Sequence, residues 1–252
     1  MNQSDFMTAF LTTYAQNEIL KKLFENDSMD NEEKSFWNLA KENAMYMPSP
    51  EVKDFIESLK RGDLVESIDC KLLKQLFINM YWHNTKTIIG FISPTLELAR
   101  GFKKIVGEGK VLEIGAGTGL LAKYLEAAGI DIVATDDYSW FSRNGFQWKK
   151  YFSVEKLDFK DAIRKYKTDF LLMCWPKYDD PFAAEAAELF TELNPNGKIL
   201  YIGEGSGGCT GDDLFHEGIL ELDPLDDINE IFPQWEGLHD NVYLVKWVGK
   251  QE

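Results

Sequence analysis

The chain has 252 residues, of which 44% are hydrophobic and 27% charged, enough to bury one or two ordinary cores without disulfides or structural metals. Its first residues, MNQSDFMTAF, lack the basic and apolar regions of a signal peptide, and no stretch approaches the roughly 20 apolar residues of a membrane span. The three cysteines, Cys70, Cys174 and Cys209, are widely spaced and indicate neither a disulfide framework nor a metal site. We therefore expect a globular, cytoplasmic protein without a metal or a membrane partner.

The net charge of −15 is concentrated in the second half of the chain. Residues 1–105 hold 13 basic and 15 acidic side chains, whereas residues 106–252 hold 14 and 27. Between Lys198 and Lys246 there are 11 acidic residues and no Lys or Arg. Such a field repels polyanions, because nucleic-acid binding depends on neutralised phosphates, so we expect no nucleic-acid partner. The acidic stretch is compatible with a solvated face that only confers solubility and with a surface that attracts a cationic substrate.

Helical signals dominate the first hundred residues. In the segment 49–62, Ser49 is a suitable cap, Pro50 suits the first helical position, and Gly62 ends an apolar face of period 3.6. A second helix is predicted to begin at Ser93 and Pro94. The sequence therefore predicts an α-helical N-terminal region over residues 1–92.

From about residue 108 onward, apolar runs alternate with helical stretches, which is typical of βα units around a parallel sheet. The predicted strands cover 110–114, 130–135, 169–174 and the run KILYIGEG from residue 198, and the predicted helices cover 119–128 and 181–193. The tail NVYLVKWVG alternates like an antiparallel strand, paired with one near 218–222. The pattern predicts an α/β fold over residues 93–252, with a mostly parallel sheet and an antiparallel last strand.

The segment VLEIGAGTGL carries the most specific motif. A strand ends at Ile114, and glycines at 115, 117 and 119 permit a tight turn before a helix. A dinucleotide-binding loop reads GxGxxG or GxGxxA, but Leu120 stands at its sixth position. The GxGxG spacing preceded by Glu113 resembles motif I of class I (Rossmann-like) S-adenosylmethionine-dependent methyltransferases instead. By that resemblance, Glu113 binds the methionine ammonium through water, and the loop from Gly115 through Ala116 and Gly117 to Gly119 packs under the methionine and ribose.

Acidic residues further along the chain complete the predicted cofactor site. Asp136 stands where the resemblance places the acceptor for the ribose hydroxyls, with Asp137 as an adjacent alternative. Asp158 occupies the place of an acceptor for the adenine amino group, with Phe159 against the ring. Asp158 is equally suited to be the N-cap of the helix FKDAIRKY, and the two roles are compatible.

Three further strings, LLMCWPKYDDPFAAEA, YIGEGSGGCTGDDLFHE and FPQWEGLHDNVYLVKW, add to the resemblance. Together with VLEIGAGTGL they resemble a largely uncharacterised group of class I methyltransferase-like proteins of bacteria and fungi, with motifs such as CWPPYDDP and GEGxGGxTGDDxFH. This resemblance covers roughly residues 90–252 and leaves the first hundred residues largely outside it. It implies the Rossmann-like methyltransferase sheet but no particular substrate.

Four residues are candidates for the catalytic site: Trp175, Tyr178, Glu204 and His216. The string WPKY is similar to the (D/N/S)PP(Y/F/W) loop of amino-group nucleic-acid methyltransferases, but Trp175 has no acceptor at the first position. Trp175 and Tyr178 suit an aromatic wall for a planar or cationic substrate, and equally suit packing over the sheet edge. His216 or Glu204 is a candidate general base, and a structural role for His216 is equally open.

A final expectation concerns the segment from Tyr81 to Pro94, which we expect to fold over the cofactor beside the glycine loop. These features imply methyl transfer from S-adenosylmethionine to a small molecule or a protein. A cofactor-binding but catalytically silent interaction protein would show the same fold and loop, so that alternative stays open. An NAD-dependent oxidoreductase is disfavoured by the spacing of the glycines.

Overall fold

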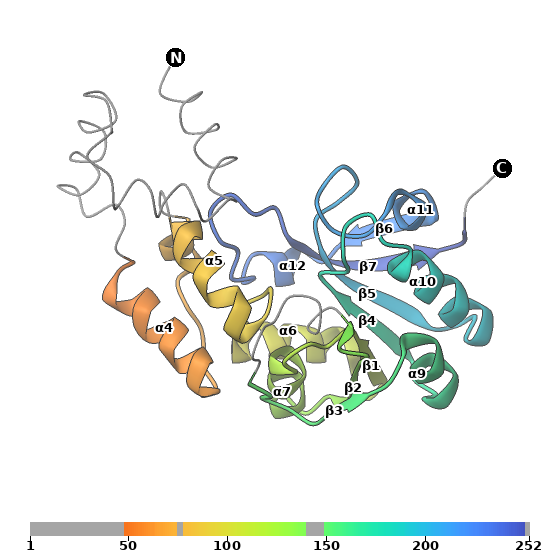
Figure 1. The fold of residues 1–252 in the computed structure, drawn as a ribbon, viewed down its shortest axis with the longest axis horizontal. Coiled ribbons are helices and arrows are strands. Elements are labelled where there is room, and N and C mark those ends of the chain that lie inside the picture. The colour runs from red at the N-terminus through yellow and green to blue at the C-terminus, as the bar shows by residue number, and fades with distance from the viewer. Residues whose placement is uncertain (1–47, 75–77, 140–148, 250–252) are drawn as a thin grey trace, which may run out of the picture. The chain divides into compact units, whose positions relative to one another are not determined.

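The computed structural model describes residues 48–74, 78–139 and 149–249, which build a seven-stranded sheet (Figure 1). The strand order is β3-β2-β1-β4-β5-β7-β6, and β7 runs antiparallel to both of its neighbours while the other pairs are parallel. The strands are β1 (Lys110–Ile114), β2 (Asp131–Asp136), β3 (Val154–Lys156), β4 (Phe170–Cys174), β5 (Lys198–Gly203), β6 (Ile219–Pro224) and β7 (Asn241–Trp247). This arrangement confirms the predicted fold class, an α/β fold with the Rossmann-like sheet of class I methyltransferases.

Helices precede the sheet and connect its strands. Before β1 lie α4 (Pro50–Arg61), the 3₁₀ helix η1 (Cys70–Leu73), α5 (Ile78–Ile89) and α6 (Leu96–Val106). Between the strands lie α7 (Leu120–Ala127), α9 (Phe159–Lys165), α10 (Phe182–Leu193), α11 (Asp213–Glu217) and α12 (Asp226–Asn229).

Two hydrophobic cores cover the two faces of the sheet, because successive strand residues point to opposite faces. Leu172 and Leu200 pack into the core that contains residues of α4, α5, α6, α7 and α12. Their neighbours Leu171 and Ile199 pack into the other core, which contains residues of α9, α10 and α11. The near-continuous apolar strands β4 and β5 are therefore buried on both sides, as expected for the centre of a doubly wound sheet.

The helices before β1 share the first core. Val52 of α4 and Trp82 of α5 belong to the same buried cluster as Phe102 of α6. The hydroxyl of Tyr124 in α7 donates a hydrogen bond to the carbonyl of Asp63 and accepts one from the N–H of Val65. A separate helical region ending at residue 92 stays a prediction, and its residues 1–47 and 75–77 lie outside the described part of the chain.

The start of α6 differs from the predicted one. Thr95, not Ser93, caps the helix, because its hydroxyl accepts a hydrogen bond from the N–H of Leu98. The Ser93 hydroxyl instead accepts the indole N–H of Trp235, 3.1 Å away, across the core. The helix therefore begins at Leu96 after the Thr95 cap, and not at the predicted Ser93 and Pro94.

Candidate functional site

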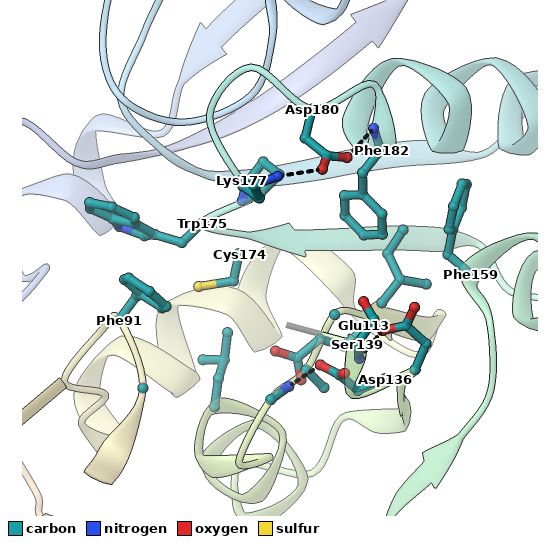
Figure 2. Close-up of a pocket in the computed structure, with 18 of the residues that line it drawn as sticks. Phe91, Glu113, Asp136, Ser139, Phe159, Cys174, Trp175, Lys177, Asp180 and Phe182 are labelled. Atoms are coloured by element: carbon teal, nitrogen blue, oxygen red, sulfur yellow. Dashed lines mark hydrogen bonds and ion pairs between the residues drawn. The ribbon is translucent and has the colours of Figure 1, made fainter. Parts of the chain in front are cut away.

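A cavity of about 460 Å³ lies at the carboxyl ends of β1, β2 and β4, where doubly wound sheets hold their ligands (Figure 2). It is lined by residues 89–92, the glycine loop, the ends of β2 and β3, and the loop after β4. Every predicted cofactor residue except Gly119 lines it: Glu113, Gly115, Ala116, Gly117, Asp136, Asp137, Asp158 and Phe159. Of the four catalytic candidates, Trp175 and Tyr178 line the cavity, whereas Glu204 and His216 do not.

The glycine loop after β1 passes three times through the left-handed region, with φ of +64° at Gly115, +57° at Gly117 and +72° at Gly119. Glycine adopts this conformation without the steric cost that other residues incur. A Cβ at Gly119 would also lie 2.7 Å from Cγ2 of Val154 and 2.8 Å from Cβ of Phe152. Gly119 therefore allows the loop to pack against the segment that carries β3, and its predicted contact with a cofactor stays a prediction.

Glu113 places a buried carboxyl group at the inner wall of the cavity. The residue is 2% exposed, and its Oε2 has no hydrogen-bond partner among the described residues. Burial, and secondly the neighbouring charge of Asp136, raise the pKa of Glu113 to about 8. An unpartnered buried acid is costly unless a ligand satisfies it, so this position suits a positively charged group such as an ammonium.

Asp136 fastens the end of β2 to the glycine loop. Its Oδ2 accepts the N–H of Gly117 at 2.8 Å, and its Oδ1 accepts the N–H of Tyr138 at 2.6 Å. Burial raises the pKa of Asp136, and the two N–H donors oppose that rise. Because an ionised carboxylate offers about four acceptor positions, Asp136 can still accept hydroxyl groups from a ligand in the cavity. The more exposed Asp137 lines the cavity beside it and accepts the N–H of Ser139.

Asp158 is the N-cap of α9, and its contact with the adenine amino group stays a prediction. Its Oδ1 accepts the N–H of Lys160 at 2.9 Å, and the residue also lines the cavity. The ring of Phe159 meets that of Phe182 edge to face, with centroids 4.9 Å apart. These two rings form an apolar surface on the same side of the cavity (Figure 2).

Trp175 and Tyr178 belong to the loop that follows β4. Trp175 has a left-handed backbone, with φ of +52°, and its N–H donates to the carbonyl of Ile202 on β5. Its ring stacks on Phe91, with centroids 5.0 Å apart and an angle of 17° between the planes. Phe91 and Trp175 lie together on one side of the cavity, away from Glu113 and Asp136 (Figure 2). Tyr178 is 61% exposed and stands at the rim.

Glu204 and His216 hold loops together outside the cavity. The Glu204 carboxylate accepts the N–H of Cys209 at 2.7 Å and that of His239 at 3.3 Å. Nε2 of His216 lies 2.9 Å from the carbonyl oxygen of Thr210. These hydrogen bonds give both residues a structural role. A role of either residue in proton transfer stays a prediction.

The loop that Glu204 and His216 stabilise is attached to the Trp175 loop by backbone hydrogen bonds. The N–H of Gly211 donates to the carbonyl of Pro176, and the N–H of Asp179 donates to that of Gly211. Lys177 and Thr210 form an isolated antiparallel bridge between the same loops. The loop that follows β4 and the loop that follows β5 are therefore one connected structure.

The segment from Tyr81 to Pro94 contributes to the cavity through its last part. Residues 89–92 line the cavity, and the carbonyl of Ile89 accepts the hydroxyl of Thr118 in the glycine loop at 2.9 Å. Trp82 is buried in the core, where its ring packs against Trp175 with centroids 6.1 Å apart. The side chains of Tyr81 and His83 lie outside the described part.

Several cavity residues were not singled out from the sequence as site residues, among them Phe91, Ser139, Lys177, Phe182 and Cys209. Lys177 forms an ion pair with Asp180. The Cys209 thiol has its pKa raised to about 12, chiefly by burial, so it stays protonated. Phe91 and Lys177 lie in segments that the sequence did indicate, 81–94 and WPKY, and Phe182 follows the proline that starts a helix after a predicted strand.

Comparisons with known proteins give slight likenesses. No model of a known protein family matches the chain, and no curated protein sequence matches it. Among solved structures it is similar to TehB from Haemophilus influenzae, with 16% identity over 61% of each chain and a TM-score of 0.36. A TehB-like SAM-dependent methyltransferase from Corynebacterium glutamicum shows 19% identity over 67% of this chain and 95% of that one, with a TM-score of 0.40.

A third similar structure is the glycopeptide N-methyltransferase MtfA complexed with S-adenosyl-L-homocysteine. It shows 20% identity over 43% of this chain and 52% of that one, with a TM-score of 0.32. The chain thus spans about three fifths of the length of the Haemophilus TehB and about half of MtfA. At these identities and scores, the likenesses are too slight to bear on the chemistry of the cavity.

Proposed function

We propose that the cavity binds S-adenosylmethionine and that the protein transfers its methyl group to an acceptor held beside Trp175 and Tyr178. The observation that carries this proposal is Oε2 of Glu113, a buried acceptor without a protein partner at the wall of a cavity. An ammonium group satisfies such an acceptor. The left-handed glycine loop beside it leaves room for a ligand to approach the backbone.

Each end of the cavity has a separate task in this proposal. Glu113 binds the cationic end of the cofactor, Asp136 accepts ribose hydroxyls, and Phe159 with Phe182 forms the apolar surface for the base. When bound, S-adenosylmethionine supplies an electrophilic methyl group on a sulfonium. The protein has to orient the acceptor for in-line attack and exclude water, and the Phe91 and Trp175 rings are placed to do both.

The acceptor in this proposal is a small molecule or a protein side chain. Trp175, Pro176 and Tyr178 form part of the cavity wall that the cofactor residues leave free, and Tyr178 stands at the rim. No helix within the described ranges is both long and apolar enough to cross a bilayer.

Isothermal calorimetry with S-adenosylhomocysteine and with NAD tests the cofactor. We expect S-adenosylhomocysteine to bind and NAD to bind more weakly or not at all. Gly117→Arg should abolish binding, because the side chain would enter the cavity from the glycine loop. Gly129→Arg is the control: φ is +83° there and nothing lies within 4 Å of a Cβ, so the same side chain is placed at another position of positive φ without touching the cavity. Tighter binding of NAD, or equal loss of binding in both variants, would reject the proposal.

Transfer of a labelled methyl group from S-adenosylmethionine to a metabolite or lysate pool tests the reaction itself. Labelled product that disappears in Trp175→Ala and in Gly117→Arg is the expected outcome. Tight cofactor binding without any labelled product would favour the catalytically silent interaction protein instead.

The acidic second half predicts that nucleic acids are not partners. We expect no retardation of duplex DNA or structured RNA in gels at physiological salt, because a strongly negative protein gains nothing from phosphate contacts. Submicromolar binding that weakens with added salt would show this prediction to be wrong.

A further inference from the structure

A second buried carboxyl group lies near the acceptor side of the cavity but does not line it. Asp240 stands immediately before β7 and is 3% exposed. Its Oδ1 has no hydrogen-bond partner among the described residues. The backbone carbonyl of the same residue is occupied, since it accepts the amide N–H of Gln234 at 2.7 Å. Oδ1 of Asp240 is therefore an unsatisfied buried acceptor on a backbone that is held in place.

Trp175 carries a buried hydrogen-bond donor that needs such an acceptor. Its indole N–H is buried and has no hydrogen-bond partner in the described part of the chain, although its ring borders the cavity. The backbone of Trp175 is in the left-handed region, which for a bulky residue persists only where the surroundings enforce it. The Phe91 and Trp82 rings fix two sides of the indole, which leaves its N–H without a group to hold it.

The indole donor and the carboxyl acceptor are close neighbours. The Trp175 side chain acts as a hydrogen-bond donor that lowers the pKa of Asp240, although the pair does not reach the distance and alignment of a full hydrogen bond. A full hydrogen bond between the indole N–H and the carboxylate would give the indole donor the partner that a buried polar group is expected to have.

We propose that Asp240 is a positioning residue, whose carboxylate accepts the indole N–H of Trp175 and so fixes the aromatic wall beside the acceptor. The proposal rests on the proposed function only for the identity of the ligand on the other side of that wall. Since an ionised carboxylate accepts a stronger hydrogen bond than a protonated one, the wall is held more firmly when Asp240 is ionised.

The ionisation of Asp240 falls in an accessible pH range. Burial is the largest cause that raises its pKa, to about 7. The charged and titratable groups that interact with it come from five separate segments: Lys74 after η1, Cys174 at the end of β4, Tyr201 on β5, Glu204 after β5, and Cys209 in the following loop. Glu204 raises the pKa of Asp240, whereas Lys74 and the Trp175 donor lower it.

Nuclear magnetic resonance of the full chain, with tryptophan labelled by ¹⁵N at the indole, tests the proposal without any cofactor. Trp175→Phe assigns the Trp175 resonance among the seven tryptophans. We expect this resonance to move downfield with a single midpoint near pH 7 as Asp240 ionises. In Asp240→Asn the resonance should no longer move between pH 5.5 and 9, since an amide does not titrate in that range.

Two neighbours provide a signature that a merely structural role of Asp240 would not produce. Glu204→Gln should lower the midpoint of the Trp175 titration, and Lys74→Met should raise it, because the two charges act on Asp240 in opposite directions. Asp223→Asn, at an exposed acid on β6, is the control and should leave the midpoint unchanged. These variants remain informative if Asp240→Asn does not fold.

A Trp175 resonance that is independent of pH, or one that titrates unchanged in Asp240→Asn, would overturn the proposal. So would shifts of the midpoint in the same direction for Glu204→Gln and Lys74→Met. A normal Trp175 titration in a protein that fails to bind S-adenosylhomocysteine would reject the proposed function alone.

Discussion

Replacing Glu113 by glutamine is expected to weaken binding of S-adenosylhomocysteine by about 10- to 100-fold, the scale for losing a hydrogen bond to a charged group. In the wild-type protein the affinity should also rise with pH, by up to about tenfold per unit below pH 8, because the Glu113 pKa is about 8 in the empty site and a cation binds its ionised form. Glu113→Gln should lose that dependence. Calorimetry at pH 6, 7 and 8 measures both effects.

The control for this prediction is Glu108→Gln, which removes an acid whose side chain is 97% exposed, a few residues earlier in the chain. It should leave both the affinity and its pH dependence unchanged. An affinity in Glu113→Gln that follows the wild-type pH profile would mean that Glu113 is not the group that meets the cation.

The same residue links pH to the stability of the empty protein. The pKa of Glu113 is raised from the ordinary value of 4.5, which applies to the unfolded chain, to about 8 in the folded protein. The stability that the protonated group contributes is therefore fully present below pH 4.5 and is lost as the pH rises through 8. Above pH 8 the wild-type protein has lost on the order of 5 kcal/mol of unfolding free energy at most through this group. Glu113→Gln should not show this loss, because glutamine does not titrate. Urea unfolding of both proteins at pH 5 and pH 9 should therefore show the variant gaining relative stability with pH, although it binds the cofactor less well.

Gly119→Ala is expected to destabilise the fold by about 2 to 5 kcal/mol. The left-handed backbone costs an alanine about 1 to 2 kcal/mol, and the close approach of its Cβ to Val154 and Phe152 adds about 1 to 3 kcal/mol of overpacking. Gly129→Ala is the matched control, since φ is +83° there and nothing lies within 4 Å of a Cβ. It should show only the backbone cost.

Urea unfolding monitored by fluorescence gives both free energies of unfolding. The difference between the two variants isolates the packing of the glycine loop against β3. Equal costs at Gly119 and Gly129 would mean that this packing is looser than the structure shows.

The regular elements were predictable because their signals are local. The apolar run Lys110–Ile114, stopped by Gly115, coincides with β1, and Pro50 with Gly62 delimits α4. The three-residue strand β3 was not predicted, because Val154–Lys156 is too short for any periodic pattern. The start of α6 was predicted at Ser93 and Pro94, whereas the helix begins after Thr95; the partner of Ser93, Trp235, is 142 residues away in sequence and leaves no local signal.

The residues of the candidate site also differ in whether a local sequence signal could identify them. Glu113 and Asp136 were selected because each lies at or just after the end of a predicted strand, and a parallel sheet brings such residues to one edge. Asp158 was selected only from the family resemblance. Phe91 was placed near the cavity only as part of the segment from Tyr81 to Pro94, and neither its contact with Trp175 nor that of Asp240 could be predicted, since only the folded chain forms them. Glu204 and His216 also follow a central strand, but their hydrogen bonds direct them to neighbouring loops, which strand position alone does not reveal.

The hydrogen bond from Thr118 to the carbonyl of Ile89 bears on how short a fragment of this protein can be and still contain the whole cavity. The glycine loop and the chain before α6 share that bond, and residues 89–92 supply one wall of the cavity. A cut between Ile92 and Ser93 would keep every strand of the sheet and yet remove that wall, together with the Trp82 ring that supports Trp175. The smallest piece that carries a whole cavity from one protein to another therefore begins no later than α5, well before the first strand.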